Sequence, residues 1–258
     1  MQQAAQVAIK TPAKRRAFIL AFILAFVSAA AGARASDAPD DLVKRVAQRE
    51  TRDASARDQY TYRQTVEIEE LDQHGAMTGS YREVRDVVFS PTGSRSEQVL
   101  GKPSNSLRRL LLTPEDFEDV RNIQPFLLTL EQLFLYETKF RGEENLDGTD
   151  YWVLEIRPRQ ILSGQRLFEG LLWIDQRDYS IVRSEGRAVP EIRTTKSENL
   201  FPHFTTLREK VDGKNWFPAT TYGEDTLYFR NGPQRIRLII RYTNYKRFGA
   251  ESTITFQP

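Results

Sequence analysis

Residues 167–186 read LFEGLLWIDQRDYSIVRSEG, and this stretch decides the class of fold. From Leu167 to Ile174 it is apolar at both alternating positions, which is typical of a strand that is buried on both faces. A second strand is expected from Tyr179 to Gly186, after a short polar interruption. A strand covered on both sides predicts a sheet with helices packed on one face and further side chains on the other.

The alternation of apolar and polar residues continues on both sides of this stretch. Upstream, Tyr60, Tyr62, Val66 and Ile68 share one parity, so we expect a strand with one buried face. Neighbouring strands should be antiparallel, because tight hairpin turns are favoured by the Asp-Gly and Asn-Gly pairs at 147–148, 212–213 and 231–232. The other strands are predicted at 81–90, 151–157, 204–211, 216–229, 235–248 and 251–256.

Three segments are predicted to be helical. Asp40 to Arg57 has apolar residues at helical spacing, and either Asp40 or Asp41 can cap its start. Thr113 and the Pro-Glu-Asp that follows it are typical of a helix start. Residues 126–136 (FLLTLEQLFLY) are apolar nearly all round, as in a buried helix. Polar loops are expected at 101–106 and 188–199.

These elements together predict an α+β protein. We expect a curved antiparallel sheet of about ten strands that forms an incomplete β-barrel, with helices covering its concave face.

The first 35 residues have the three parts of a secretory signal. A basic end closes at Arg16, an apolar run follows from Ala17 to Val27, and small residues lead to Ala33-Arg34-Ala35. We expect cleavage after Ala35, which leaves residues 36–258 as a single domain in the periplasm or outside a bacterial cell. An uncleaved membrane anchor is the alternative, although an apolar helix of this length spans only about 16 Å of a hydrocarbon core of about 30 Å.

Composition excludes several classes of function. The chain has 258 residues, no cysteine and a formal net charge of +2. The first 35 residues carry five bases and no acid, so the remainder has 32 bases against 35 acids and a net charge of −3. We therefore do not expect a nucleic-acid partner. The remaining length is enough to build a core that holds without disulfides.

Sequence motifs for catalysis or metal binding are missing. His74 and His203 are far apart, and no His or Cys spacing matches a zinc site. The sequence has no thiol nucleophile, nucleophile elbow or phosphate-binding loop. The acids between Glu143 and Asp150 could form a carboxylate pair or bind a hard cation, but acids in turns are normally only solvated. We expect no enzyme, no metal and no cofactor.

One predicted strand carries a cationic face. Arg235, Arg237 and Arg241 alternate with apolar residues, which places the guanidinium groups on one side. Guanidinium groups pair well with phosphate, so these residues are a candidate interaction face. The alternative is a solvent face that acids on neighbouring strands balance.

The order and pattern of the strands resemble a known family. Phe168 to Asp175, followed by Tyr179 to Arg183, is similar to the "G-x-L-W-I-D … I-x-R" strand pair of outer-membrane lipoprotein-sorting-like proteins. These proteins belong to the LolA-like superfamily, named for a periplasmic lipoprotein carrier. The segment 212–218 (DGKNWFP) and the early strand at Tyr60 fit the same pattern, and the resemblance covers roughly residues 58–256.

The resemblance implies a half-barrel over an apolar cavity that holds acyl chains. The protein would then be a non-catalytic binding protein for a lipid or a lipidated polypeptide, in a process such as outer-membrane lipoprotein sorting, with a membrane-associated protein as a further partner. The expected lining residues are Tyr62, Val66, Phe126, Leu130, Leu154, Ile156, Leu238 and Ile240. The alternative is an interaction or sensor module with a filled core, whose working surface is the face of Arg235, Arg237 and Arg241.

Overall fold

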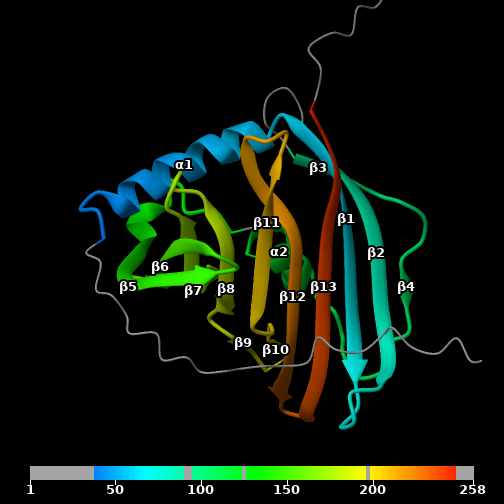
Figure 1. Ribbon diagram of the computed structural model, residues 1–258. Coiled ribbons are helices and arrows are strands. Elements are labelled where there is room, and N and C mark those ends of the chain that lie inside the picture. The colour runs from blue at the N-terminus through cyan, green and yellow to red at the C-terminus, as the bar shows by residue number, and fades with distance from the viewer. Residues whose placement is uncertain (1–37, 90–94, 124–125, 196–197, 248–258) are drawn as a thin grey trace, which may run out of the picture. The chain divides into compact units, whose positions relative to one another are not determined.

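An eleven-stranded antiparallel sheet is the frame of the protein in the computed structural model, which describes residues 38–89, 95–123, 126–195 and 198–247. The strand order is β3-β2-β1-β13-β12-β11-β8-β7-β6-β5, and β4 pairs with β2 (Figure 1). In the described residues the end strands β3 and β5 do not pair with each other, so the sheet is not closed. The strands are β1 (Tyr60–Leu71), β2 (Met77–Phe89), β3 (Arg95–Val99), β4 (Ser104–Asn105), β5 (Tyr136–Leu146), β6 (Thr149–Pro158), β7 (Leu167–Asp175), β8 (Ile181–Val189), β11 (Phe204–Val211), β12 (Asn215–Phe229) and β13 (Gly232–Arg247).

The alternation of residues determines which side of each strand is buried. In β1 the side chains at even positions from Tyr60 to Glu70 are buried, and most of those between them are partly exposed. The Asp-Gly turns at 147–148 and 212–213 have positive φ angles at both residues, as two-residue hairpin turns require. Figure 1 shows β12, β13, β1 and β2 as long neighbouring strands, with β6 and β7 turned across them. The predicted curved, incomplete barrel is confirmed.

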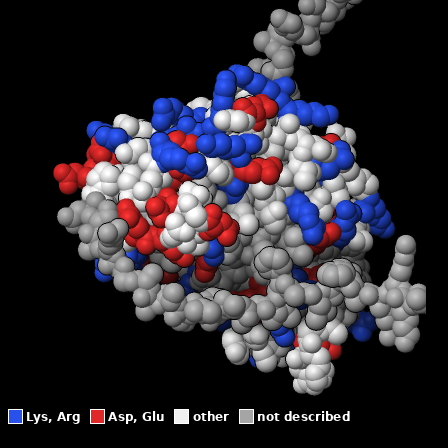
Figure 2. Space-filling model, viewed as in Figure 1, with Lys and Arg blue, Asp and Glu red and all other residues white. Residues whose placement is uncertain are grey.

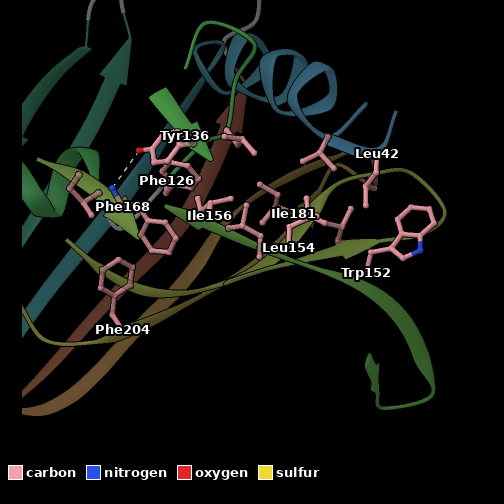
Figure 3. Close-up of a cluster of buried hydrophobic side chains, with 14 of the residues drawn as sticks. Leu42, Phe126, Tyr136, Trp152, Leu154, Ile156, Phe168, Ile181 and Phe204 are labelled. Carbon is pink, nitrogen blue, oxygen red and sulfur yellow. Dashed lines mark hydrogen bonds between the residues drawn. The ribbon is translucent and has the colours of Figure 1, made fainter. Parts of the chain in front are cut away.

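Helix α1 (Leu42–Arg57) lies across β6, β7 and β8. Its Leu42 and Val46 side chains belong to a buried cluster with Leu154, Ile156 and Phe168, which come from the strands beneath it (Figure 3). Burial of this apolar stripe supplies most of the stability of a helix that is otherwise highly charged.

Helix α2 (Pro114–Asn122) covers another part of the sheet. Its Val120 packs in a second buried cluster with Val66 of β1 and Leu238 of β13. The predicted helix start is confirmed, because Thr113 and Asp116 form a capping box in which the Thr113 backbone N–H donates to the Asp116 carboxylate at 2.7 Å. No helix in the described part of the chain has the length and apolar character needed to cross a membrane.

The helix predicted at 126–136 is wrong. The chain has no regular structure at 126–129, turns at 130–132, makes a short 3-10 helix (η1, Leu133–Leu135), and enters β5 at Tyr136. Tertiary partners occupy the backbone groups that a helix would pair internally. The Phe126 carbonyl accepts a hydrogen bond from the Arg208 guanidinium, and the Leu130 N–H donates to Thr51 Oγ1 at 3.0 Å.

Other differences from the sequence predictions are smaller. The expected loop at 188–199 contains a short hairpin, β9 (Ile192–Arg193) with β10 (Glu198–Asn199), and the expected loop at 101–106 contains β4. Strands β3 and β5 were not predicted. The predicted secretory signal and the strand predicted at 251–256 lie outside the described residues.

Candidate functional site

A segment at residues 107–112, here called the strap, connects β4 to α2 across the buried face of the sheet. It is neither helix nor strand. Its leucines at 107, 110 and 112 pack against the buried cluster that contains Val66, Ile68, Leu238 and Ile240. Because the strap has no regular backbone ladder of its own, its position depends on the contacts that follow.

The carboxylate of Glu70 holds the strap from below. Three consecutive backbone N–H groups donate to it: Arg108 at 3.0 Å, Arg109 at 2.6 Å and Leu110 at 2.6 Å. Glu70 is only 1% exposed, so its charge is compensated by these donors rather than by water. Charge-assisted bonds from successive amides are stronger than neutral ones, and they fix both the position and the conformation of the strap.

A tight contact with β2 fixes the start of the strap. The Ser106 N–H donates to the Ser80 carbonyl at 2.8 Å, and the two side-chain oxygens lie 3.4 Å apart. The neighbouring Gly79 permits this approach, since a Cβ there would lie 2.7 Å from the Ser106 carbonyl oxygen and 2.8 Å from Glu70 Oε2. A glycine at this position is therefore required for the strap to lie flat on β2.

A small apolar pocket lies beneath the strap. Its walls and floor come from the strap, from β1, β12 and β13, and from the segment after β10. The volume of the pocket that water can occupy is about 30 Å³, which is room for about two waters. The apolar lining residues are Ile68, Leu110, Leu111, Leu112, Leu200, Phe201, Pro202, Leu227, Phe229, Ile236 and Leu238.

Two acids at the edge of the pocket are already engaged. Asp116 accepts a hydrogen bond from the Asn199 side chain at 2.8 Å in addition to its capping contacts, and burial raises the pKa of its carboxyl. Glu198 pairs with Arg193 and accepts from the Arg230 N–H at 3.0 Å. Both carboxylates therefore hold the walls of the pocket in place.

Seven of the eight residues predicted to line a cavity are divided between two buried clusters. Phe126, Leu154 and Ile156 pack beneath α1 (Figure 3), and Tyr62, Val66, Leu238 and Ile240 pack beneath the strap and α2. Leu130 is separate from both groups, with 44% of its surface exposed. Of the eight, Leu238 lines the pocket.

Neither the strap nor Glu70 was identified from the sequence, although the sequence contains an indication of each. Glu70 has the same parity as Val66 and Ile68, which places its carboxylate on the buried face. The run of three leucines at 110–112 lies directly before the helix start at Thr113, where a solvated connection would be polar.

The arginine face is neutralised by carboxylates on neighbouring strands. Arg235 and Arg237 pair with Glu224 of β12, and Arg237 also pairs with Glu69 of β1. Arg241 pairs with Glu67. All three guanidinium groups therefore contribute to a ladder of ion pairs across three strands.

The acidic residues near the β5–β6 turn also have structural partners. Glu143 accepts a hydrogen bond from the Trp152 indole N–H at 3.2 Å, and Glu144 accepts one from Trp173 at 2.6 Å. Trp173 lies in a small apolar cluster on the face of the sheet away from α1, which explains why its strand is apolar at both parities. Among the described residues, no group of three or more acidic, His or Cys side chains could hold a metal ion.

A buried ion pair between Glu50 and Arg208 was also not predicted. Glu50 lies on the inner face of α1 and is fully buried, and Arg208 of β11 donates to it at 2.9 and 3.0 Å. Burial raises the pKa of the Glu50 carboxyl, and the charge of Arg208 opposes that rise. The pair fixes α1, β11 and the Phe126 carbonyl to one another.

Comparisons with known proteins show likeness in structure. No protein-family model matches the chain, and no curated protein matches it. A DUF1329 family protein from Desulfovibrio piger is 16% identical with a TM-score of 0.39, and the match covers 82% of this chain and 92% of that one. A putative outer membrane lipoprotein-sorting protein domain from Vibrio parahaemolyticus is 11% identical with a TM-score of 0.35. That match covers 79% of this chain and 93% of that one.

A LolA superfamily protein from Nitrosomonas europaea is 16% identical with a TM-score of 0.31, and the match covers 81% of this chain and 97% of that one. At these identities the likeness concerns the fold alone.

Proposed function

We propose that this chain is an exported, non-catalytic binding protein that holds an acyl chain of a lipid or a lipidated polypeptide between the sheet and the strap. The observation that carries the proposal is the strap that covers the pocket. An apolar floor that includes Ile68, Ile236 and Leu238 is covered by six residues without regular structure, fastened by one carboxylate. Such a cover can be displaced without disturbing a helix or a strand.

Binding requires the strap to move, because the closed pocket holds only about two waters. An acyl chain would replace the side chains of Leu110 and Leu112 over the floor. Each buried CH₂ contributes about 0.8 kcal/mol, so a chain of ordinary length offsets the loss of the Glu70 contacts and of the leucine packing. The closed and loaded forms would then be close in free energy, which suits uptake and release.

The polar surroundings of the pocket support a binding role. Asp116 and Glu198, the acids in the lining, are held by other protein groups, so neither is positioned as a free acid or base. We propose acyl chains as the ligand and a membrane-associated protein as donor or acceptor, with outer-membrane lipoprotein sorting as one process that this would serve. The proposed location is the periplasm or the exterior of the cell.

The proposal is tested by lipid content and by titration. The protein is purified without detergent and examined by native mass spectrometry, then delipidated and titrated with a fluorescent fatty acid. Leu110→Gln and Leu112→Gln should each strengthen fatty-acid binding, because the acyl chain takes the place of these side chains over the apolar floor and both substitutions weaken the closed form that competes with it. Leu207→Gln is the matched control, since Leu207 is half-exposed on β11 and lies outside the pocket lining. Equal binding by the strap variants and the control would contradict the proposal.

A second candidate is an interaction or sensor module with a filled core. It is favoured by the packing of seven of the eight predicted lining residues, each at most 4% exposed. Its working surface would be the face of Arg235, Arg237 and Arg241. Reversing these charges should then abolish capture of a protein partner and leave fatty-acid binding unchanged, whereas the strap variants should have no effect on capture.

A further inference from the structure

A separate open cleft lies beside the last two turns of α1. The β11–β12 turn and the end of β13 form its other walls. The volume of the cleft is about 530 Å³. The cleft shares no residue with the pocket beneath the strap. Binding in this cleft is therefore independent of the proposed acyl-chain site.

Cations dominate the lining of this cleft. Arg52, Lys214 and Arg247 face one carboxylate, Asp212, which accepts a hydrogen bond from the Tyr60 hydroxyl at 2.6 Å. Within the described ranges, no carboxylate lies within ion-pair distance of any of the three cations. Figure 2 shows that Lys and Arg side chains gather over this end of the molecule, along α1.

Two other open clefts of similar size show that this charge is unusual for the protein. In the first, Arg141, Arg157 and Arg187 are matched by the carboxylates of Glu155, Glu169 and Glu185. In the second, two arginines are outnumbered by three glutamates. Both contain several short ion pairs, so their cations are already neutralised.

The backbone that carries the three cations is fixed by neighbouring contacts. The Arg49 guanidinium pairs with Asp53 and also donates to the Lys214 carbonyl at 2.6 Å, which fastens the β11–β12 turn to α1. Arg247 donates to the Gln59 side chain at 2.8 Å. Arg52 projects from a helix. An anion that enters the cleft would therefore meet one guanidinium group that is already held, and two exposed cations whose backbone positions are fixed.

We propose that this cleft binds the phosphate group of a phosphomonoester or phosphodiester. Two guanidinium groups supply paired N–H donors that match phosphate oxygens, and Lys214 adds a compact charge. The cleft is open enough to admit a group attached to the phosphate, so the anion need not be free in solution.

The test is a titration followed by NMR of the purified, isotope-labelled protein at constant ionic strength. Inorganic phosphate and glycerol 3-phosphate should give saturable shifts of the amides of Arg52, Lys214 and Asn215, and chloride should not. Arg52→Gln and Lys214→Gln should each lower affinity about tenfold, as expected for loss of one charge-assisted contact. Lys44→Gln is the control, because it removes the same charge from the exposed part of α1 outside the cleft.

An experiment with vesicles distinguishes a lipid headgroup from a soluble phosphomonoester as the source of the phosphate. Preferential sedimentation with phosphatidylglycerol vesicles over phosphatidylcholine vesicles, lost in Arg52→Gln, assigns a lipid headgroup. Saturation by glycerol 3-phosphate without vesicle preference assigns a soluble phosphomonoester, and either result supports the cleft. Shifts that follow ionic strength alone, or an equal loss of affinity in Lys44→Gln, would overturn it.

Discussion

The Glu70 carboxylate accepts a hydrogen bond of 2.6 Å from the backbone N–H of Leu110. The first residue lies on the floor of the sheet and the second is in the strap, so this bond closes the pocket between them. It belongs to a set of three successive N–H donors on one carboxylate. Three of the contacts that hold the closed form therefore converge on one side chain, and this makes the strap accessible to single substitutions.

Replacing Glu70 with glutamine should loosen the strap. The amide keeps one acceptor oxygen but places an NH₂ group among backbone donors, so we expect a loss of about 1–3 kcal/mol in the free energy of unfolding. Hydrogen exchange of the amides at 108–110 should accelerate more than exchange in β1. Both effects are measured on the same sample by urea unfolding and by exchange mass spectrometry.

Glu69→Gln is the control for this substitution. Glu69 is the neighbouring residue on the opposite face, where it pairs with Arg237. It should leave the exchange of the strap unchanged. If both variants accelerate exchange at 108–110 to the same degree, Glu70 does not hold the strap.

Stability should depend on the protonation of Asp119. Burial raises the pKa of this carboxyl from 3.8 to about 6, against the opposing charge of Arg166. The folded state thus binds this proton more tightly than the unfolded state. The stabilisation is complete below about pH 4 and is lost as the pH rises through 6, by about 3 kcal/mol. Asp119→Asn should remove this pH dependence, which urea midpoints at pH 4.5 and 7 measure; an unchanged difference between the two midpoints would refute it.

The Glu50–Arg208 pair should behave as a coupled unit. Glu50→Gln leaves a buried arginine without its counter-charge, and we expect a loss of about 3–5 kcal/mol. The double variant Glu50→Leu/Arg208→Leu removes both charges and should be more stable than Glu50→Gln. A double-mutant cycle by denaturant unfolding measures the coupling, and additive single effects would contradict it.

Glu224 should contribute to stability only above strongly acidic pH. Hydrogen bonds from Tyr222, Arg237 and Arg235 lower the pKa of its carboxyl to about 2. Because the folded pKa lies below the ordinary 4.5, the stabilisation is present above pH 4.5 and is lost as the pH falls through 2. Glu224→Gln should cost about 1 kcal/mol at pH 7 and nothing at pH 2, in acid titrations followed by circular dichroism. A cost that stays constant over this range would show that the ion pairs are not its source.

Most strands were predictable because their residues alternate, or are apolar at both parities as in β7, and because turn residues follow them. The limits of β7 and β11 match the prediction, and the Asp-Gly turns have the expected backbone angles. The segment 126–136 was mispredicted because its composition is the same for a buried helix and for an irregular chain within a core. The contacts from Arg208 and Thr51, both distant in sequence, decide between them.

The candidate site was less predictable than the fold. Parity identified Val66, Leu238 and Ile240 as buried, but could not tell a packed core from a cavity. That distinction depends on what covers the sheet, and the cover is an irregular segment without periodicity. Glu70 was not identified as a site residue, because its partners are backbone N–H groups, which carry no sequence signal.

The most direct test of the account uses a disulfide across Ser80 and Ser106, whose side-chain oxygens are 3.4 Å apart. The chain has no cysteine, so Ser80→Cys/Ser106→Cys can form only this bond within one molecule. The measurement is fluorescent fatty-acid binding by the delipidated double variant, oxidised and then reduced, with each single variant as control. We predict that oxidation weakens binding and that reduction restores it, because the bond holds Ser106, directly before the strap, on β2 and so restricts how far the strap can move. Equal binding in the oxidised and reduced forms would contradict the strap as the entrance to the site.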